Sequence, residues 1–157
     1  MIKESKAYKY ASWCVKEDNH FVGRYVKRQC QAWIDIVDGK NAEAYIDEKA
    51  YKKVCRILGL MVHPDLHCPM SEGIEDYAWL MITAIFCTKE TGTGNRYYQT
   101  ALLEIARKNF KTFVSGIIFI IDMLISPKFS RFFSVAPDLK LSKELQVAIK
   151  KIIKSSP

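Results

Sequence analysis

Apolar residues recur every three or four positions through the first half of the chain. This spacing places them on one face of an α-helix. The clearest stripe begins at Val22 and ends at Val37, where Asp38-Gly39 marks a helix end. The helices predicted in this way cover residues 7–16, 22–37, 50–58 behind the capping residue Asp47, and 74–85. We therefore expect a helical N-terminal subdomain over residues 1–88.

The pattern changes after Thr88. The turn sequence Thr91-Gly92-Thr93-Gly94-Asn95 is followed by residues 96–105, which are rich in Tyr, Thr, Leu and Ile. Such composition after a turn is typical of a β-strand. Residues 131–136 read Arg-Phe-Phe-Ser-Val-Ala and end at a proline, which predicts a second strand.

Helical spacing returns between and after these strands. Residues 111–126 are apolar on nearly all sides, which predicts a buried helix. Asp138 precedes a last helix with apolar residues on one side and five lysines on the other. Such a lysine face is typically solvated, and contact with DNA phosphates is the alternative. Because a strand–helix–strand crossover makes its two strands parallel, we expect an α/β fold. It would be an incomplete parallel-sheet P-loop NTPase core over residues 89–157, in the order strand–loop–helix–strand–helix.

The segment between the first predicted strand and the buried helix has features of a phosphate-binding loop. Lys111-Thr112 stands at a strand-to-helix turn, where backbone N–H groups and a helix N-terminus attract phosphate oxygens. A lysine there adds a positive charge, and a threonine hydroxyl can bind Mg²⁺. The standard loop has glycine at the two positions that hold Ile105 and Phe110 here. Ligands of parallel sheets bind at the carboxyl ends of the strands, where this loop would lie.

The same segment resembles the ATPase domain of the large terminase subunit of tailed bacteriophages. That family's loop typically reads Ala-Arg-Lys-Asn-Gly-Lys-Thr, and this chain has Ala106-Arg107-Lys108-Asn109-Phe110-Lys111-Thr112. Arg96 in Asn95-Arg96-Tyr97 matches the arginine at the entry to the strand before the family's loop. Val135-Ala136-Pro137-Asp138, followed by Gln146, matches a later strand and helix start. The resemblance covers residues 77–157.

The resemblance implies that the loop binds ATP with Mg²⁺. Lys111 would contact the β- and γ-phosphates, Thr112 would hold Mg²⁺, and Arg107 would make a second contact with the γ-phosphate. The backbone amides that would cradle the phosphates are those of Lys108, Asn109, Phe110, Lys111 and Thr112. Where the family has an adenine-binding glutamine, this chain has Ala78, and the neighbouring Tyr77 and Trp79 are candidates for base stacking.

The implied function of the parent protein is ATP-driven packaging of viral DNA in the cytoplasm of a bacterial host. Its partners would be double-stranded viral DNA, the small terminase subunit and the portal, with no membrane involved. The family's catalytic acids and nuclease domain have no counterpart in this sequence. We therefore expect a fragment of the motor with no catalytic residues and little or no ATP hydrolysis. We also expect self-association of the fragment, because missing strands would leave sheet edges uncovered.

Composition and charge restrict these interpretations. The chain has 157 residues, 49% of them apolar, and a net charge of +7, which suits a nucleic-acid or nucleotide partner. Five cysteines without a repeated close spacing predict free thiols in a reducing compartment. The longest apolar run, residues 113–125, is shorter than the ~18 residues that span a bilayer, so we expect a soluble protein. The residues considered for zinc, and disfavoured for lack of a Cys-x-x-Cys pair, are Cys55, His63, His67 and Cys68.

Two other functions stay open. The chain could be a non-enzymatic helical protein that binds DNA or a partner and carries a degenerate loop. It could also be another P-loop ATPase, such as a relative of the helicases. Nucleotide titration of the wild type against Lys111→Ala would distinguish the first of these from an ATP-binding motor fragment.

Overall fold

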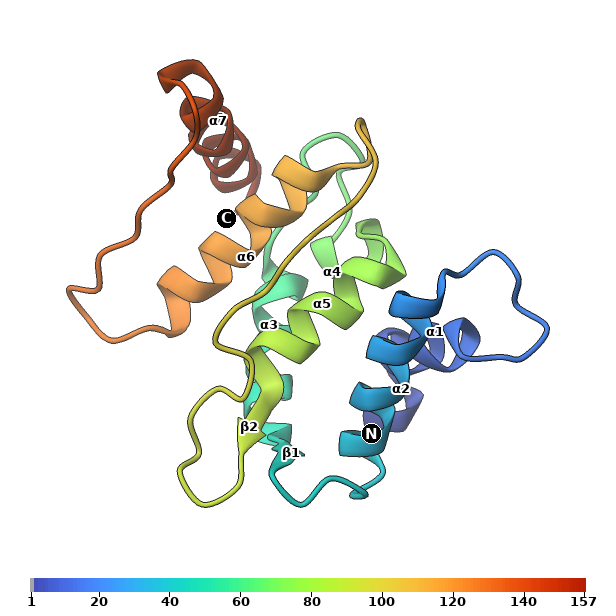
Figure 1. Ribbon diagram of the computed structural model, residues 1–157. Helices are drawn as coiled ribbons and strands as arrows, with labels where there is room; N and C mark the ends of the chain where they lie inside the picture. The colour runs from blue at the N-terminus through green and yellow to red at the C-terminus, as the bar shows by residue number, and fades with distance from the viewer. Residues whose placement is uncertain (1) are drawn as a thin grey trace. The chain divides into compact units, whose positions relative to one another are not determined.

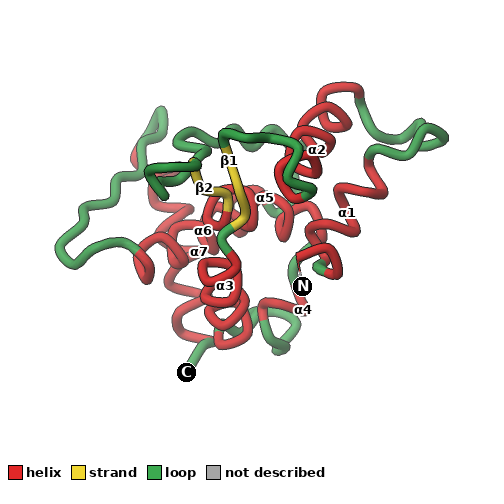
Figure 2. Tube along the Cα trace, turned by 90° about the horizontal axis from the view of Figure 1, so that it is seen from below, coloured by secondary structure: helices red, strands yellow, loops and turns green. Residues whose placement is uncertain are grey.

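A computed structural model describes residues 2–157 as a mostly helical chain, drawn as a ribbon in Figure 1 and as a tube in Figure 2. The chain divides into two compact units. The first unit comprises Met1–Val54 and Ile74–Ala101, and the second comprises Cys55–Gly73 and Leu102–Pro157. One division point falls inside helix α3, Glu48–Leu60, whose first half belongs to the first unit.

Helix α1, Lys6–Cys14, is the centre of the first unit. It follows a short 3₁₀-helix, η1 (Ile2–Glu4), and packs against α2, Arg24–Val37, and α5, Asp76–Cys87. The Oγ of Ser5 caps α1 by accepting a hydrogen bond from the Tyr8 N–H at 3.1 Å. Because the buried residues of α1 are small, the two partner helices can approach it closely and supply the larger core side chains. The small residues are Ala7, Ala11 and Cys14, and the larger ones include Trp33, Ile34, Trp79, Ile82 and Phe86.

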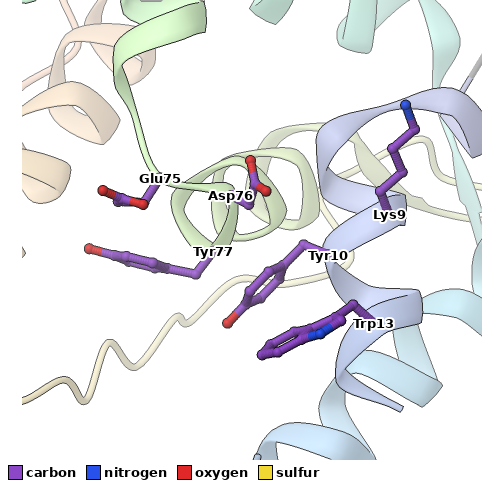
Figure 3. Close-up of a pocket in the computed structure, with 6 residues that line it drawn as sticks. All are labelled: Lys9, Tyr10, Trp13, Glu75, Asp76 and Tyr77. Carbon is purple, nitrogen blue, oxygen red and sulfur yellow. The ribbon is translucent and has the colours of Figure 1, made fainter. Parts of the chain in front are cut away.

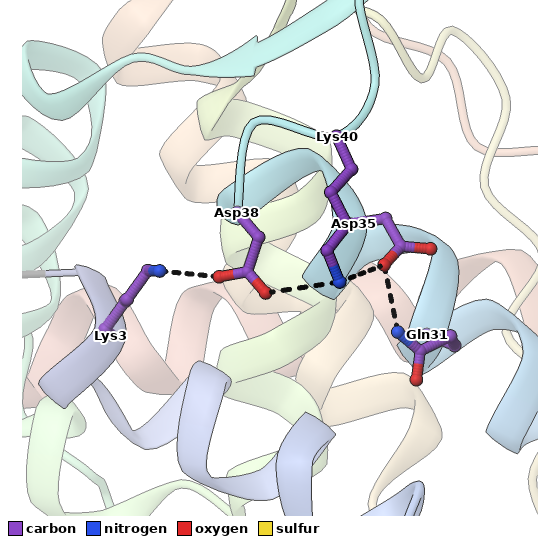
Figure 4. Close-up of polar contacts among 5 residues, drawn as sticks. All are labelled: Lys3, Gln31, Asp35, Asp38 and Lys40. Carbon is purple, nitrogen blue, oxygen red and sulfur yellow. Dashed lines mark hydrogen bonds and ion pairs between the residues drawn. The ribbon is translucent and has the colours of Figure 1, made fainter.

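Charged residues at the C-terminal end of α2 are paired with one another (Figure 4). Lys3 Nζ lies 2.6 Å from Asp38 Oδ1, and Lys40 Nζ lies 3.4 Å from Asp35 Oδ1 and 3.9 Å from Asp38 Oδ2. Gln31 Nε2 donates a hydrogen bond to Asp35 Oδ1 at 3.0 Å. The hydrogen bond from Lys3 holds the pKa of Asp38 below its ordinary value. The charges of the two lysines and the two aspartates at this end of α2 therefore balance each other.

A two-stranded antiparallel sheet is the only sheet in the described residues (Figure 2). Strand β1, Ala44–Ile46, pairs with β2, Thr88–Glu90, so that Ala44 lies opposite Glu90 and Ile46 opposite Thr88. The ladder continues at one end, where the Asp47 N–H donates to the Cys87 carbonyl at 2.8 Å. The predicted α/β fold with a parallel-sheet P-loop core over residues 89–157 is therefore wrong.

Neither strand predicted for that core forms. Arg96 makes an isolated antiparallel bridge with Lys89, and residues 97–105 and 131–136 have irregular backbone. A strand needs a neighbour for its backbone N–H and C=O groups and a face to bury its side chains. The Tyr97 N–H extends this bridge by donating to the Thr88 carbonyl at 3.0 Å, but within residues 2–157 no strand pairs with 98–105 or 131–136. The strand-like composition of these segments therefore does not produce strands.

The helices predicted from apolar spacing are confirmed, with ends shifted by a few residues. The predicted capping residue Asp47 accepts hydrogen bonds at its Oδ1 from the N–H groups of Lys49, at 2.8 Å, and Ala50, at 3.2 Å. Helix α6, Lys111–Ile125, begins at the predicted residue, and α7, Leu139–Ser155, follows Asp138. Local spacing and capping therefore determine these elements.

Helices α6 and α7 form the core of the second unit with the end of α3 and the short helix α4, Met70–Gly73. The two long helices meet at Gly116. A methyl group added there would lie 3.6 Å from Ala148 Cβ, 3.6 Å from Ile152 Cδ1 and 3.7 Å from Ile149 Cγ1. These are ordinary contact distances, so the interface is close at Gly116 without being overpacked. The buried apolar residues of the unit are Leu58, Met61, Met70, Val114, Ile117, Ile120, Ile121 and Ile152.

Substituting Gly116 tests this packing. We expect Gly116→Ala to stabilise the protein, because alanine has the better helix propensity by about 0.5–1 kcal/mol and its methyl group gains contacts with α7. Gly116→Leu should lower stability by overpacking the interface. The matched control is Gly59→Ala in α3, where an added methyl group meets nothing within 4 Å and gains propensity alone. Thermal unfolding followed by circular dichroism measures all three, and a lower midpoint for Gly116→Ala than for wild type would contradict this packing.

Candidate functional site

The predicted phosphate loop leads into the N-terminus of α6. Lys108 and Phe110 have φ angles of 70° and 53°, in the left-handed region that residues other than glycine adopt infrequently. Phe110 is the N-cap residue, and its ring cannot accept a hydrogen bond, so the first amides of α6 have no side-chain cap from this position. Irregular backbone, not a strand, leads into the loop. The helix half of the predicted turn is therefore present, and the strand half is not.

The loop residues of the predicted site are all exposed to solvent. Arg107, Lys108 and Lys111 are exposed, and none of them forms an ion pair with another described residue. Asn109, Phe110 and Thr112 are also exposed. Three cationic side chains therefore stand next to the N-terminus of α6, an arrangement that favours an anion.

The two aromatic residues predicted to stack on a base belong to α5 in the first unit, whereas the loop belongs to the second. Trp79 is 5% exposed and packs in the core of its unit. Tyr77 is partly exposed at the start of α5. Of the two, only Tyr77 has ring surface that a ligand can reach.

A row of lysines covers the outer side of α7. At the helical rotation of about 100° per residue, these lysines fall within an arc of roughly 100°. They are Lys140, Lys143, Lys150, Lys151 and Lys154, which we call the lysine face. The opposite side of α7 carries Ala148, Ile149 and Ile152, which pack on α6. The lysine face therefore points away from the buried interface.

Little negative charge compensates this surface. Among the described residues, only Lys151 of the lysine face has an ion pair, and its Nζ lies 2.6 Å from Asp65 Oδ1. The second unit contains 11 Lys and Arg against 6 Asp and Glu, a net charge of +5 out of +7 for the whole chain. The positive charge of the protein is thus concentrated in one of its two units.

The loop between α6 and α7 exposes aromatic rings among basic residues. Phe129 is 97% exposed and Phe133 is 77% exposed. Phe132 anchors the loop, since its ring centroid lies 6.0 Å from that of Phe119 in α6. Lys128, just before Phe129, and Arg131, between Phe129 and Phe133, are exposed as well. Sequence reasoning missed this surface by assigning residues 131–136 to a strand; the alternation of basic and aromatic residues is the signal that would have revealed it.

Residues 61–70 link the first turn of α6 to the last turn of α7. The His63 ring lies 4.8 Å from the Phe113 ring, between centroids. The next contact is a hydrogen bond from the Val62 N–H to Ser156 Oγ at 3.0 Å. The ion pair of Asp65 with Lys151 makes a third link. This loop therefore fixes the basic start of α6 and the basic end of α7 to a common support.

His63 is the buried centre of this support. Its Nδ1 accepts hydrogen bonds from the N–H groups of Asp65, at 3.3 Å, and Leu66, at 3.1 Å, which requires an unprotonated Nδ1. Burial lowers the pKa of His63 below its ordinary value, and the positive charges of Lys151 and His67 lower it further, against the opposing effect of Asp65. His63 is thus neutral in the folded protein at neutral pH.

Within residues 2–157 no three His, Cys, Asp or Glu side chains are arranged to hold a metal ion, and this includes the region of Cys55, His63, His67 and Cys68. None of the five cysteines, all of which lie in the described residues, forms a disulfide. Over the same residues, no helix combines the length and apolar character needed to cross a membrane.

Comparisons of this chain with protein-family models, with curated proteins and with solved structures found no match. The candidate sites therefore rest on the geometry above.

The neutral state of His63 predicts that acid weakens the second unit. Its folded pKa is depressed, so its contribution to stability is present above the unfolded pKa of about 6.5 and is lost as the pH falls through the folded pKa. We expect a lower urea midpoint at about pH 5 than at about pH 7.5 for wild type, and a smaller difference for His63→Leu. Exposed His20 provides the control, because His20→Gln should keep the wild-type difference. An unchanged difference in His63→Leu would contradict this assignment.

Proposed function

We propose that this protein binds nucleic acid through the second unit, with the lysine face of α7 and the loop Arg107–Lys111 contacting phosphates. The observation that carries this proposal is the concentration of cations without compensating acids. Over residues 107–154 there are 10 Lys and Arg against 3 Asp and Glu. Such a surface attracts polyanions without reading their sequence.

The exposed loop between α6 and α7 favours single-stranded over duplex nucleic acid. Bases of a single strand are free to stack on aromatic side chains, and each stacked base contributes about 1–3 kcal/mol. Phe129 and Phe133 offer such rings beside Lys128 and Arg131. In a duplex the bases are already stacked on each other, so these rings would add little.

An anionic membrane is less well supported as the ligand. A basic helix that lies on a membrane inserts its apolar side into the lipid. In α7 that side is already used, because Ile152 is buried and Gly116 of α6 lies against Ala148 and Ile149. The lysine face therefore fits a phosphate backbone better than a lipid surface.

Removing charge from the lysine face should weaken binding and its dependence on salt. For the triple variant Lys143→Gln, Lys150→Gln, Lys154→Gln, we expect the log–log salt slope to fall by up to about 2, at roughly 0.7 per phosphate contact. Fluorescence anisotropy with a labelled single-stranded oligonucleotide at several salt concentrations measures this. The matched control, Lys49→Gln, Lys52→Gln, Lys53→Gln, removes the same charge from exposed positions of the first unit. Equal losses in the two triple variants would refute a specific role for α7.

The aromatic contribution is tested separately. Phe129→Leu with Phe133→Leu should reduce affinity for the single strand by about tenfold or more while leaving affinity for a duplex of the same length unchanged. Phe21→Leu is the control, because Phe21 is equally exposed but belongs to the first unit. Equal affinity for single strand and duplex in the wild type would count against stacking and leave a purely electrostatic contact.

A second candidate function is the one implied by the resemblance to the terminase ATPase, namely ATP binding at Arg107–Thr112. The left-handed residues Lys108 and Phe110, the N-terminus of α6 and three exposed cations support a phosphate contact there. The absence of a preceding strand in the described chain counts against a P-loop of the usual architecture.

Nucleotide titration decides between the two candidates. If the loop is an ATP site, Mg²⁺-ATP should bind saturably, and Lys111→Ala should weaken it by at least about tenfold, because a phosphate contact is lost. Lys128→Ala, which removes an exposed lysine from another loop of the same unit, should not. Isothermal titration calorimetry gives both affinities. Equal weak binding of ATP to the wild type and both variants would rule out the second candidate and leave the first untouched.

A further inference from the structure

A cleft of about 430 Å³ lies in the first unit, between α1 and the start of α5 (Figure 3). Its lining residues are Lys9, Tyr10 and Trp13 of α1 with Glu75, Asp76 and Tyr77. Three of the six are aromatic, two are acidic and one is basic. Aromatic and acidic side chains therefore line the same cleft.

The aromatic wall is fixed in place. The ring centroids of Tyr10 and Trp13 lie 5.9 Å apart, with 33° between the ring planes. Trp13 is 45% exposed, so its indole offers a face to a ligand. The Trp13 carbonyl accepts a hydrogen bond from Nδ2 of buried Asn19 at 3.0 Å, and Asn19 Oδ1 accepts one from the Phe21 N–H at 3.2 Å. These bonds hold the end of α1, and with it the position of Trp13.

The two carboxylates of the cleft are uncommitted. Glu75 is the N-cap residue of α5, yet its side chain makes no capping hydrogen bond. Neither Glu75 nor Asp76 has an ion pair with another described residue. The one cation of the lining, Lys9, extends away from the rings of Tyr10 and Trp13 in Figure 3. Glu75 and Asp76 are exposed at the start of α5, across the cleft from Tyr10 and Trp13, and in Figure 3 neither carboxylate points toward those two rings.

The charge of these carboxylates reaches the rings. Burial raises the pKa of Tyr10, and the neighbouring Cys14, Cys30 and Asp76 raise it further. Burial and then Glu75 raise the pKa of Tyr77 in the same direction. The negative charge of Asp76 therefore acts on Tyr10, and that of Glu75 acts on Tyr77.

We propose that this cleft binds the guanidinium group of an arginine side chain presented by a partner protein. A guanidinium is flat, so it can stack on Trp13 or Tyr10, and its N–H groups can pair with Glu75 or Asp76 when either of these exposed side chains turns toward the rings. A quaternary ammonium could contact the rings but has no N–H to donate, and a lysine ammonium has no flat face to stack. The partner segment is thus specified by chemistry: an exposed arginine within a short accessible stretch.

A peptide titration of the full chain tests this inference. The probes are blocked Gly-Arg-Gly, Gly-Lys-Gly and Gly-citrulline-Gly peptides, the last of which keeps the shape of arginine without its charge. We expect saturable changes at the Trp13 indole N–H in NMR spectra with the arginine peptide, and binding about tenfold or more weaker for citrulline. Equal affinity for arginine and citrulline would overturn the proposal.

Substitutions locate the site. Glu75→Gln with Asp76→Asn should abolish the preference for arginine over citrulline, and Trp13→Leu should weaken binding of the arginine peptide. Glu43→Gln with Glu48→Gln removes the same charge from exposed positions of the first unit and should change neither. Circular dichroism verifies that each variant is folded. Loss of binding in the Glu43 and Glu48 variant to the same degree would show a general charge effect and overturn the assignment to this cleft.

Discussion

The close contact between α6 and α7 at Gly116 is the constraint on which the second unit depends. This contact buries the apolar side of α7, because Ala148, Ile149 and Ile152 lie against α6. Because the lysines lie on the opposite side of the helix from these buried residues, they point into solvent. The same contact brings both helix ends within reach of the loop around His63, so helix packing, the basic surface and the histidine support form one cooperative arrangement.

The two units differ in how far their positive side chains are paired with acidic ones. In the first unit, Lys3 and Lys40 pair with Asp38 and Asp35, and the cleft beside Trp13 gathers carboxylates. In the second, nearly every cation lacks a partner among the described residues. Self-repulsion of this kind opposes compactness, and it is relieved when a polyanion binds. Ligand binding and stability should therefore be linked in the second unit, and the first unit provides an internal reference.

Helices were predictable from the sequence because their signals are local. Asp47 caps α3 and apolar spacing delimits α2, so a few neighbouring residues determine each helix. Strands depend on partners remote in the sequence, and the composition of residues 96–105 and 131–136 carried no information about whether partners exist. The helix start at Lys111 was predicted correctly from the sequence. The cleft beside Trp13 was not predicted. Tyr10 and Tyr77 share it only because α1 packs on α5, a contact that no local pattern encodes.

In the part of the chain that the structure describes, four residues other than glycine have left-handed backbone: His67, Lys108, Phe110 and Phe129. Each conformation costs about 1 kcal/mol or more that glycine would avoid. All four lie in the second unit, in loops beside its basic surface. An engineer seeking a more robust protein would choose glycine or asparagine there first. At Lys108 and Phe129 that choice would also remove a side chain from the surface exposed to ligands. The gain in stability would therefore come with a loss of ligand affinity.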